Sequence, residues 1–266
     1  MRSGIPAGEF CRHGARADIA AVFDRSFYLR SGDTFICVGE PGIGNGPLTL
    51  IADFSASFRP SNLGLHPGRS AFLADRRIII GDAIEFDLNR CVPWHPPPWP
   101  VCQSPIRLTD ICAAVARAAA VEAPREGFGQ VFSLHEQVTH RTTLASLARG
   151  PIARFESWLS DALGAHDTPA IAPAPVQGLI GLGPGLTPSG DDFLVGALAF
   201  LDALAERNIH AALAAAIADA PPASTSALSR CFLRAAAAGH IGEHLHCAVA
   251  SVISGKPARS WRRRFN

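Results

Sequence analysis

One proline-rich segment limits the folding of this chain more than any other feature. It reads Val92-Pro-Trp-His-Pro-Pro-Pro-Trp-Pro-Val101. Because proline fixes φ and has no amide hydrogen, neither a helix nor a central strand can run through this segment. We therefore place a domain boundary here and predict two domains, residues 1–100 and residues 101–266.

Before the boundary, from Ile19 to about Asp87, the chain has the pattern of short strands. Its apolar segments are brief, rich in β-branched residues and bounded by Gly, Pro, Asn or Asp, which is typical of strands joined by tight turns. Three such segments are Thr34-Phe-Ile-Cys-Val38, Pro47-Leu-Thr-Leu-Ile51 and Arg77-Ile-Ile-Ile80. We predict a β-rich N-terminal domain.

After the boundary the apolar residues recur at three- and four-residue intervals, which is the helical period. Thr109 can cap a helix that carries Ile111, Val115 and Ala118 on one face, and Gly164 can end another. Further helical segments are Ile152 to Leu159, Phe193 to Ala205, Ala211 to Ala218 and Leu228 to Ala238. We therefore predict an α+β fold, with a β-rich N-terminal part and a helical C-terminal part.

The composition narrows the classes of partner. The 266 residues are 48% hydrophobic, enough for one large core or two modest ones. With 24 Lys and Arg against 23 Asp and Glu, the charges nearly cancel, which argues against a nucleic acid or an acidic membrane as partner. A small ligand or a protein partner is expected instead.

The cellular setting is also indicated by the sequence. No apolar run approaches the ~20 residues that span a bilayer, and the start Met1-Arg-Ser-Gly4 lacks the apolar centre of a secretory signal. The seven cysteines are scattered and form no Cys-x-x-Cys pair, so we expect reduced thiols without a disulfide framework or a zinc knuckle. We expect a cytoplasmic protein.

The segment Gly181-Leu-Gly-Pro-Gly-Leu-Thr-Pro-Ser-Gly-Asp-Asp192 is the strongest candidate for a functional site. Its glycines and prolines exclude regular structure, whereas the residues from Phe193 onward form one apolar helix face. Two helix starts are open: Thr187 followed by Pro188 at the first helical position, or Ser189 with Asp192 in a capping box. Either start directs backbone N–H groups toward the loop.

Such a loop is suited to binding an anion. Unpaired N–H groups and the positive end of the helix dipole attract a phosphate or a carboxylate, and glycines at 181, 183 and 185 let it approach the backbone. The hydroxyls of Thr187 and Ser189 are further donors. Of the two acids, Asp192 suits a helix-capping role, and Asp191 suits a catalytic role through a cation such as Mg²⁺ or Mn²⁺.

Other interpretations of this segment are a nucleotide-binding motif and a purely structural turn. It resembles neither a P-loop, since no Gly-Lys-Ser/Thr follows, nor a dinucleotide fingerprint, so ATP and NAD are poor candidates. The segment can also be no more than a turn followed by a well-capped helix.

The extended segment Gly181 to Gly196 resembles the signature of a bacterial family of unknown function. That family includes the third (H) subunit of oxamate carbamoyltransferase, an enzyme of anaerobic allantoin breakdown. Two other segments share the resemblance: Gly42-Ile-Gly-Asn-Gly-Pro47, and Thr225-Ser-Ala-Leu-Ser229 followed by Leu233, Ala236 and Gly239. The resemblance extends from about residue 18 to about residue 254.

The resemblance implies a subunit of an enzyme that needs several different subunits. In the carbamoyltransferase, oxalurate and phosphate give oxamate and carbamoyl phosphate, a reaction that positioned donors can promote without a covalent enzyme intermediate. Asn45, Thr225 and Ser229 are then added to the loop as candidate substrate-binding residues, and the site is expected between the two halves. Two alternatives stay open: a metal-assisted hydrolase that uses Asp191 and Asp192, and a non-catalytic anion-binding or scaffolding subunit.

Two further patterns carry weaker hypotheses. His240-Ile-Gly-Glu-His244 has the order of inverted zinc peptidases, with His246 nearby, but Gly242 weakens the helix that this spacing requires. The tail Lys256 to Arg264 is basic, which is typical of a solvated chain end as well as of a contact with a phosphate-rich partner.

Overall fold

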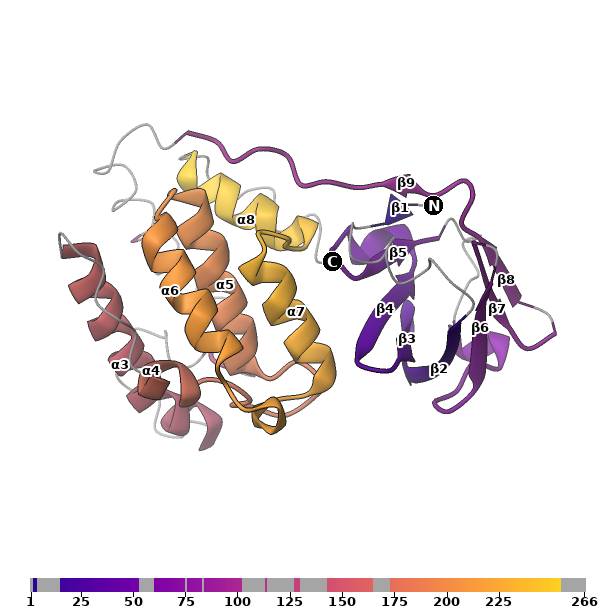
Figure 1. Cartoon of the computed structure of the whole chain (residues 1–266), viewed down its shortest axis with the longest axis horizontal. Helices are drawn as coiled ribbons and strands as arrows, with labels where there is room; N and C mark the ends of the chain where they lie inside the picture. Colours follow the sequence, from indigo (N-terminus) through magenta and orange to yellow (C-terminus); the bar gives the residue numbers. More distant parts are fainter. Residues whose placement is uncertain are drawn as a thin grey trace. The chain divides into compact units, whose positions relative to one another are not determined.

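The computed structural model describes residues 2–3, 15–52, 60–74, 76–82, 84–101, 113, 127–129, 143–164 and 173–254. The chain divides into two compact units (Figure 1). The first unit comprises Met1–Pro97 and His240–His246, and the second comprises Pro98–Gly239 and Cys247–Asn266. Each unit is described by itself below.

The first unit contains a curled sheet, with the strand order β8-β7-β6-β2-β3-β4-β5-β1-β9 over the described residues. Its pairs are antiparallel, except that β4 pairs with β5 and β1 with β9 in parallel. The strands are β1 (Arg2–Ser3), β2 (Ala15–Val22), β3 (Ser26–Ser31), β4 (Thr34–Gly39), β5 (Thr49–Ile51), β6 (Ser70–Ala74), β7 (Arg77–Ile80), β8 (Ile84–Asp87) and β9 (Val92–Pro93). Two short 3₁₀ helices, η1 (Pro41–Ile43) and η2 (Pro60–Leu63), interrupt the connections.

The three strands predicted from the sequence are present. β7 has the predicted bounds, β4 extends the prediction by one residue to Gly39, and β5 begins at Thr49 rather than at Pro47. The proline-rich segment contributes only the short β9, which pairs with β1 alone at the edge of the sheet. An edge position tolerates proline because one side of the strand needs no donor.

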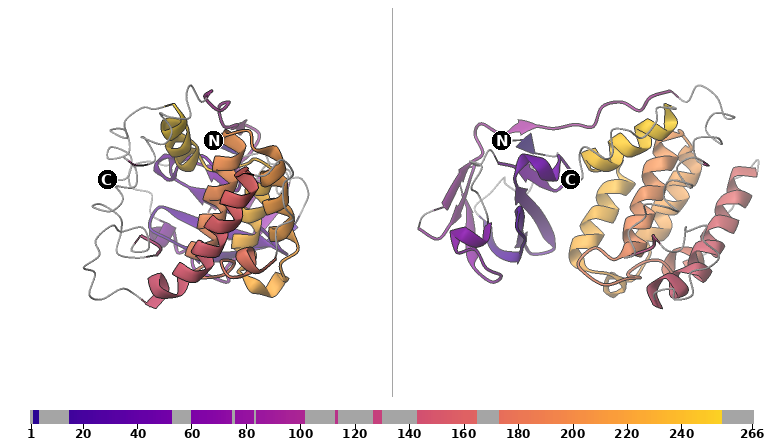
Figure 2. Two further views of the ribbon diagram at one scale, coloured as in Figure 1. Left: turned by 90° about the vertical axis from the view of Figure 1, so that its left-hand side faces the viewer. Right: turned by 180° about the vertical axis from the view of Figure 1, so that it is seen from behind.

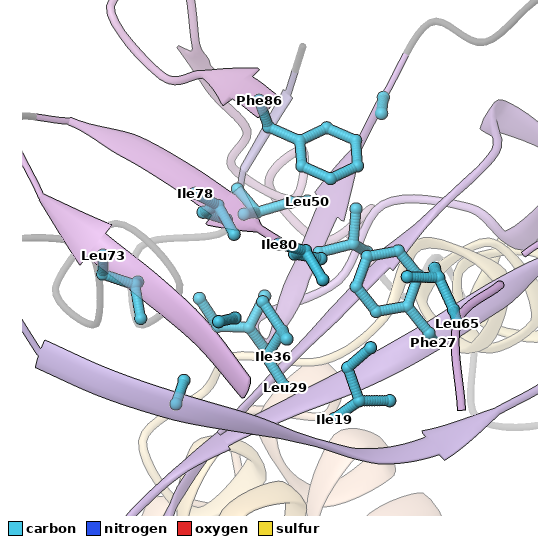
Figure 3. Packing of buried hydrophobic residues seen from close by; sticks show 14 of the residues in the cluster. Ile19, Phe27, Leu29, Ile36, Leu50, Leu65, Leu73, Ile78, Ile80 and Phe86 are labelled. Atoms are coloured by element: carbon cyan, nitrogen blue, oxygen red, sulfur yellow. The ribbon is translucent and has the colours of Figure 1, made fainter. Parts of the chain in front are cut away.

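One face of the sheet carries an apolar core (Figure 3). Alternate residues of a strand point to the same face, so Phe27 and Leu29 of β3 and Ile78 and Ile80 of β7 are all fully buried. Burying each such side chain stabilises a fold by about 1.5–3 kcal/mol. The core therefore depends on the period-two pattern that the sequence displays.

The second unit is helical over its described residues (Figure 2). Its elements are α3 (Thr143–Gly164), α4 (Pro173–Gln177), α5 (Ser189–Ala203), α6 (Arg207–Ala218), the 3₁₀ helix η3 (Pro222–Ser224) and α7 (Ala227–Ala237). α8 (Glu243–Ile253) begins in the first unit and ends in the second. α5 packs against both α6 and α7, and the Phe155 ring of α3 meets the Phe193 ring of α5 at 5.3 Å between centroids.

The helix predictions hold wherever the structure describes the chain. α3 contains the predicted apolar stripe and ends at Gly164, and α6 and α7 match their predicted segments within four residues. The helix expected to start at Thr109 lies outside the described residues. The α+β fold class is confirmed. Among the described helices, none has the length and apolarity to cross a membrane.

Candidate functional site

The glycine-rich segment leads directly into α5, as the sequence predicts, but the helix begins differently. Pro188 is the N-cap residue, and its carbonyl accepts the amide N–H groups of Asp191 at 2.9 Å and Asp192 at 3.1 Å. The helix start has no side-chain cap. Both predicted starts are therefore wrong, because Pro188 stands before the first helical residue and has no N–H that Asp192 can accept in a capping box.

Two glycines of the segment allow close backbone contacts that no other residue would permit. A Cβ on Gly181 would lie 1.9 Å from the carbonyl oxygen of Ser224, and one on Gly190 would lie 1.9 Å from that of Leu179. Gly181 also has φ of +74°, which L residues rarely adopt. These contacts hold the start of the loop against η3 and the start of α5 against the turn after α4.

Asp191 ties the loop to α7. Its side chain is buried, with 1% of its surface exposed. One carboxylate oxygen accepts the N–H of Gly181 at 2.9 Å, and the other accepts the hydroxyls of Thr225 and of Ser229, the latter at 2.7 Å. The buried carboxylate of Asp191 thus connects three other residues that the sequence analysis named, Gly181, Thr225 and Ser229.

Ser226 forms a second tie that the sequence analysis missed. Its hydroxyl donates to the carbonyl of Leu186 and accepts the N–H of Ser229 at 2.9 Å, so that it caps α7 and holds the loop together. The local signal was available, since a Ser two residues after a turn ending in Ser224 is a good N-cap. Its second partner was not predictable, because Leu186 is distant in sequence.

Between the contacts made by Asp191 and by Ser226, the middle of the loop has backbone N–H groups without an acceptor. In the part of the chain that the structure describes, the N–H groups of Gly183, Gly185, Leu186 and Ser189 donate to no protein acceptor. Gly183 lies directly over the start of α5, since a Cβ there would lie 2.9 Å from the Ser189 nitrogen. The predicted cluster of backbone donors is therefore present at the helix start.

Asp192 lies on the outer side of the same helix turn. Its side chain is exposed in part, yet the removal of water by the surrounding protein atoms, and secondly the neighbouring Asp191 carboxylate, raise the pKa of its carboxyl to about 6. The two adjacent acids thus have different surroundings. Asp191 is buried and hydrogen-bonded, whereas Asp192 is more exposed and has a raised pKa.

Asn45 lies in the first unit, between two glycines, and its partner there is Glu243 at the start of α8. The backbone N–H and the side-chain amide of Asn45 donate to one Glu243 carboxylate oxygen at 3.0 and 2.6 Å, and the Glu243 N–H donates to the Asn45 carbonyl at 2.7 Å. The Asn45 side-chain oxygen is buried and has no hydrogen-bond partner. These contacts fix the Gly-Asn-Gly turn to the segment His240–His246.

Within the histidine-rich motif, His246 makes a further contact in this unit. His240 precedes α8, so it does not share a helix face with His244, and His246 bonds the Pro97 carbonyl at 2.9 Å. Burial lowers the pKa of His246. Over the described residues, no three His, Cys, Asp or Glu side chains are grouped as metal ligands.

Two protein families match the chain on either side of its proline-rich segment. The AllH family N-terminal domain matches residues 5–93, which include the sheet, and oxamate carbamoyltransferase subunit AllH matches residues 179–264, which include the loop, α5 and α7. The chain is thus an α+β protein whose family matches support the role of a subunit of a multi-subunit enzyme. The chain belongs to the AllH family. No curated protein and no solved structure matches it.

Proposed function

We propose that this chain is a subunit of a carbamoyltransferase of the oxamate type and that its glycine-rich loop, residues 181–192, binds the anionic substrate. The observation that carries the proposal is the set of free N–H groups at Gly183, Gly185, Leu186 and Ser189. They belong to a loop fixed at both ends and to the start of α5, where the helix dipole favours a negative charge. Phosphate and a carboxylate are both anions that such donors bind.

The proposed reaction needs an anion site more than a nucleophilic side chain. A phosphate oxygen forms a bond to the carbamoyl carbon of oxalurate, the bond from that carbon to the oxamate nitrogen breaks, and the nitrogen takes up a proton. Negative charge develops on the carbamoyl oxygen, so fixed donors stabilise the transition state. The loop N–H groups and the hydroxyls of Thr187 and Ser189 are the donors proposed here.

The surroundings of Asp191 support a positioning role for this residue. Both of its carboxylate oxygens accept hydrogen bonds from Gly181, Thr225 or Ser229. A divalent cation would have to replace these donors, so Mg²⁺ or Mn²⁺ fits Asp191 poorly, and the metal-assisted alternative loses its principal ligand. We propose that Thr225 and Ser229 act on the substrate only through Asp191 and the loop.

Anion binding is tested by thermal protection with two matched loop variants. A ligand that binds only the native state raises its stability by about 1.4 kcal/mol at ten times Kd. The wild-type chain is melted with increasing sulfate, phosphate or oxamate at constant ionic strength, with chloride as the control salt. We expect protection by the three anions and none by chloride.

The variants Gly183→Ala and Gly185→Ala distinguish a steric block of the anion site from the backbone strain that alanine causes at either position. Both replace a glycine of positive φ, 128° and 96°. The methyl group at 183 would lie 2.9 Å from the Ser189 nitrogen, whereas the one at 185 would meet nothing within 4 Å. Gly183→Ala should therefore abolish the protection, and Gly185→Ala, which adds backbone strain without a steric clash, should weaken it much less. Equal protection in both variants would contradict the proposed site, and protection without turnover in the assembled enzyme would favour the non-catalytic alternative.

A further inference from the structure

We propose that Arg230 is the positioning residue that keeps the glycine-rich loop in its anion-binding geometry. The inference rests on the proposed function. Arg230 lies on α7, directly after Ser229, and is half-buried. Its Nη1 donates to the carbonyl of Pro222 and, at 3.5 Å, to that of Thr225. The side chain thus holds both ends of the turn that leads from η3 into α7.

This turn contacts the start of the loop. Its Ser224 carbonyl lies against Gly181, where an added Cβ would be only 1.9 Å away. Its Thr225 hydroxyl donates to Asp191, and Asp191 accepts the Gly181 N–H. A displacement of the turn would therefore be transmitted to Gly181 through two independent contacts.

An arginine suits this role because the turn has backbone carbonyls that lack a backbone donor. Pro221 and Pro222 have no N–H, and the carbonyls of Pro222 and Thr225 accept no backbone N–H within the described residues. A guanidinium carries several donors in a rigid plane and can bond two carbonyls at once, whereas the lysine ammonium is a flexible point donor. The bonds to Arg230 therefore replace the missing backbone bonds of the turn.

The same helix supplies a matched control. Arg234 lies one helical turn after Arg230, is exposed, and donates to the Cys231 sulfur at 3.6 Å. Arg230→Met and Arg234→Met remove the same charge and keep a similar aliphatic chain. Any effect of net charge on anion binding is common to both variants, so the difference between them isolates the contacts with the turn.

Two measurements on the full-length chain test the inference. The first is amide hydrogen exchange of residues 179–192 without any anion, and the second is the sulfate affinity obtained from thermal protection. We expect Arg230→Met to raise the exchange rate of this segment by about tenfold and to weaken sulfate binding by about tenfold, with Arg234→Met unchanged in both. Arg230→Lys should show smaller changes in exchange and in affinity than Arg230→Met, because the ammonium group can still donate to one of the two carbonyls.

The outcomes separate the two proposals. If wild type fails to bind sulfate, the proposed function fails, and hydrogen exchange still decides whether Arg230 positions the loop. If Arg230→Met and Arg234→Met agree in exchange and in affinity, Arg230 does not position the loop. A global loss of stability would raise exchange throughout the second unit, whereas the inference requires the rise to be confined to residues 179–192 and to the turn that Arg230 holds, residues 222–226. Should Arg230→Met not fold, Arg230→Lys carries the same comparison.

Discussion

Replacing Asp191 by alanine should destabilise the second unit strongly. The carboxylate accepts three hydrogen bonds while only 1% of the side chain is exposed. A hydrogen bond to a charged group contributes about 1.5–3 kcal/mol, and a buried donor left without an acceptor costs about 1–3 kcal/mol. The two hydroxyls can rotate toward other acceptors, but the Gly181 N–H cannot. We therefore expect a loss of roughly 3–5 kcal/mol, less than the plain sum of the bonds.

Thermal and urea unfolding measure this loss directly. For a unit of this size, 1 kcal/mol shifts Tm by about 2–4 °C, so Asp191→Ala should lower it by about 6–20 °C. Asp191→Asn should cost less, about 1–3 kcal/mol, because the amide keeps one acceptor and the hydroxyls can accept its N–H groups. A loss below about 1 kcal/mol for Asp191→Ala would refute the reasoning, because the three bonds would then contribute nothing net.

Two further predictions concern Asp192 and the contact between Asn45 and Glu243. Asp192 has a pKa raised from 3.8 to about 6 in the fold, so the folded protein binds this proton more tightly and loses stability as pH rises between these values. The stability of Asp192→Asn relative to wild type should therefore increase across this range, by at most about 1 kcal/mol after solvent screening. A difference in the free energy of urea unfolding that does not change with pH would contradict this. Asn45→Asp places a carboxylate against Glu243, where Asn45 now donates at 2.6 Å, and should cost about 2–3 kcal/mol at pH 7.5 but less at pH 5, where the pair shares a proton. Asn45→Ala serves as the control, since its loss in the same urea titration should not depend on pH.

The structure moves the expected stabilising role from Asp192 to Asp191, because Asp192 does not cap α5 and Asp191 is buried and hydrogen-bonded. Asp192 was assigned to the helix cap and Asp191 to the chemistry, from a helix start that the structure moves by one residue. Whether Asp191 acts on the substrate stays a prediction. Its burial makes it the residue whose loss should affect stability first.

Features that depend on neighbouring residues were predictable from the sequence. Strand β7 and the end of α3 at Gly164 follow from periodicity and from turn residues within a few positions. The proline-rich segment excludes internal strands and helices by its covalent structure alone. The loop before α5 could be recognised as non-regular from its glycines, because their conformational freedom is a local property.

The partners of the buried groups depended on the tertiary structure. Asp191 bonds residues that are 10, 34 and 38 positions away, and Asn45 bonds Glu243 at a separation of 198. Periodicity indicates which face of a helix is apolar, but it cannot indicate which distant hydroxyl or amide a polar side chain will meet. The sequence alone thus determined where the candidate loop lies and that it precedes a helix. Only the packing of α7 and η3 against that loop decided that Asp191 is buried and that free N–H groups remain between Gly183 and Ser189.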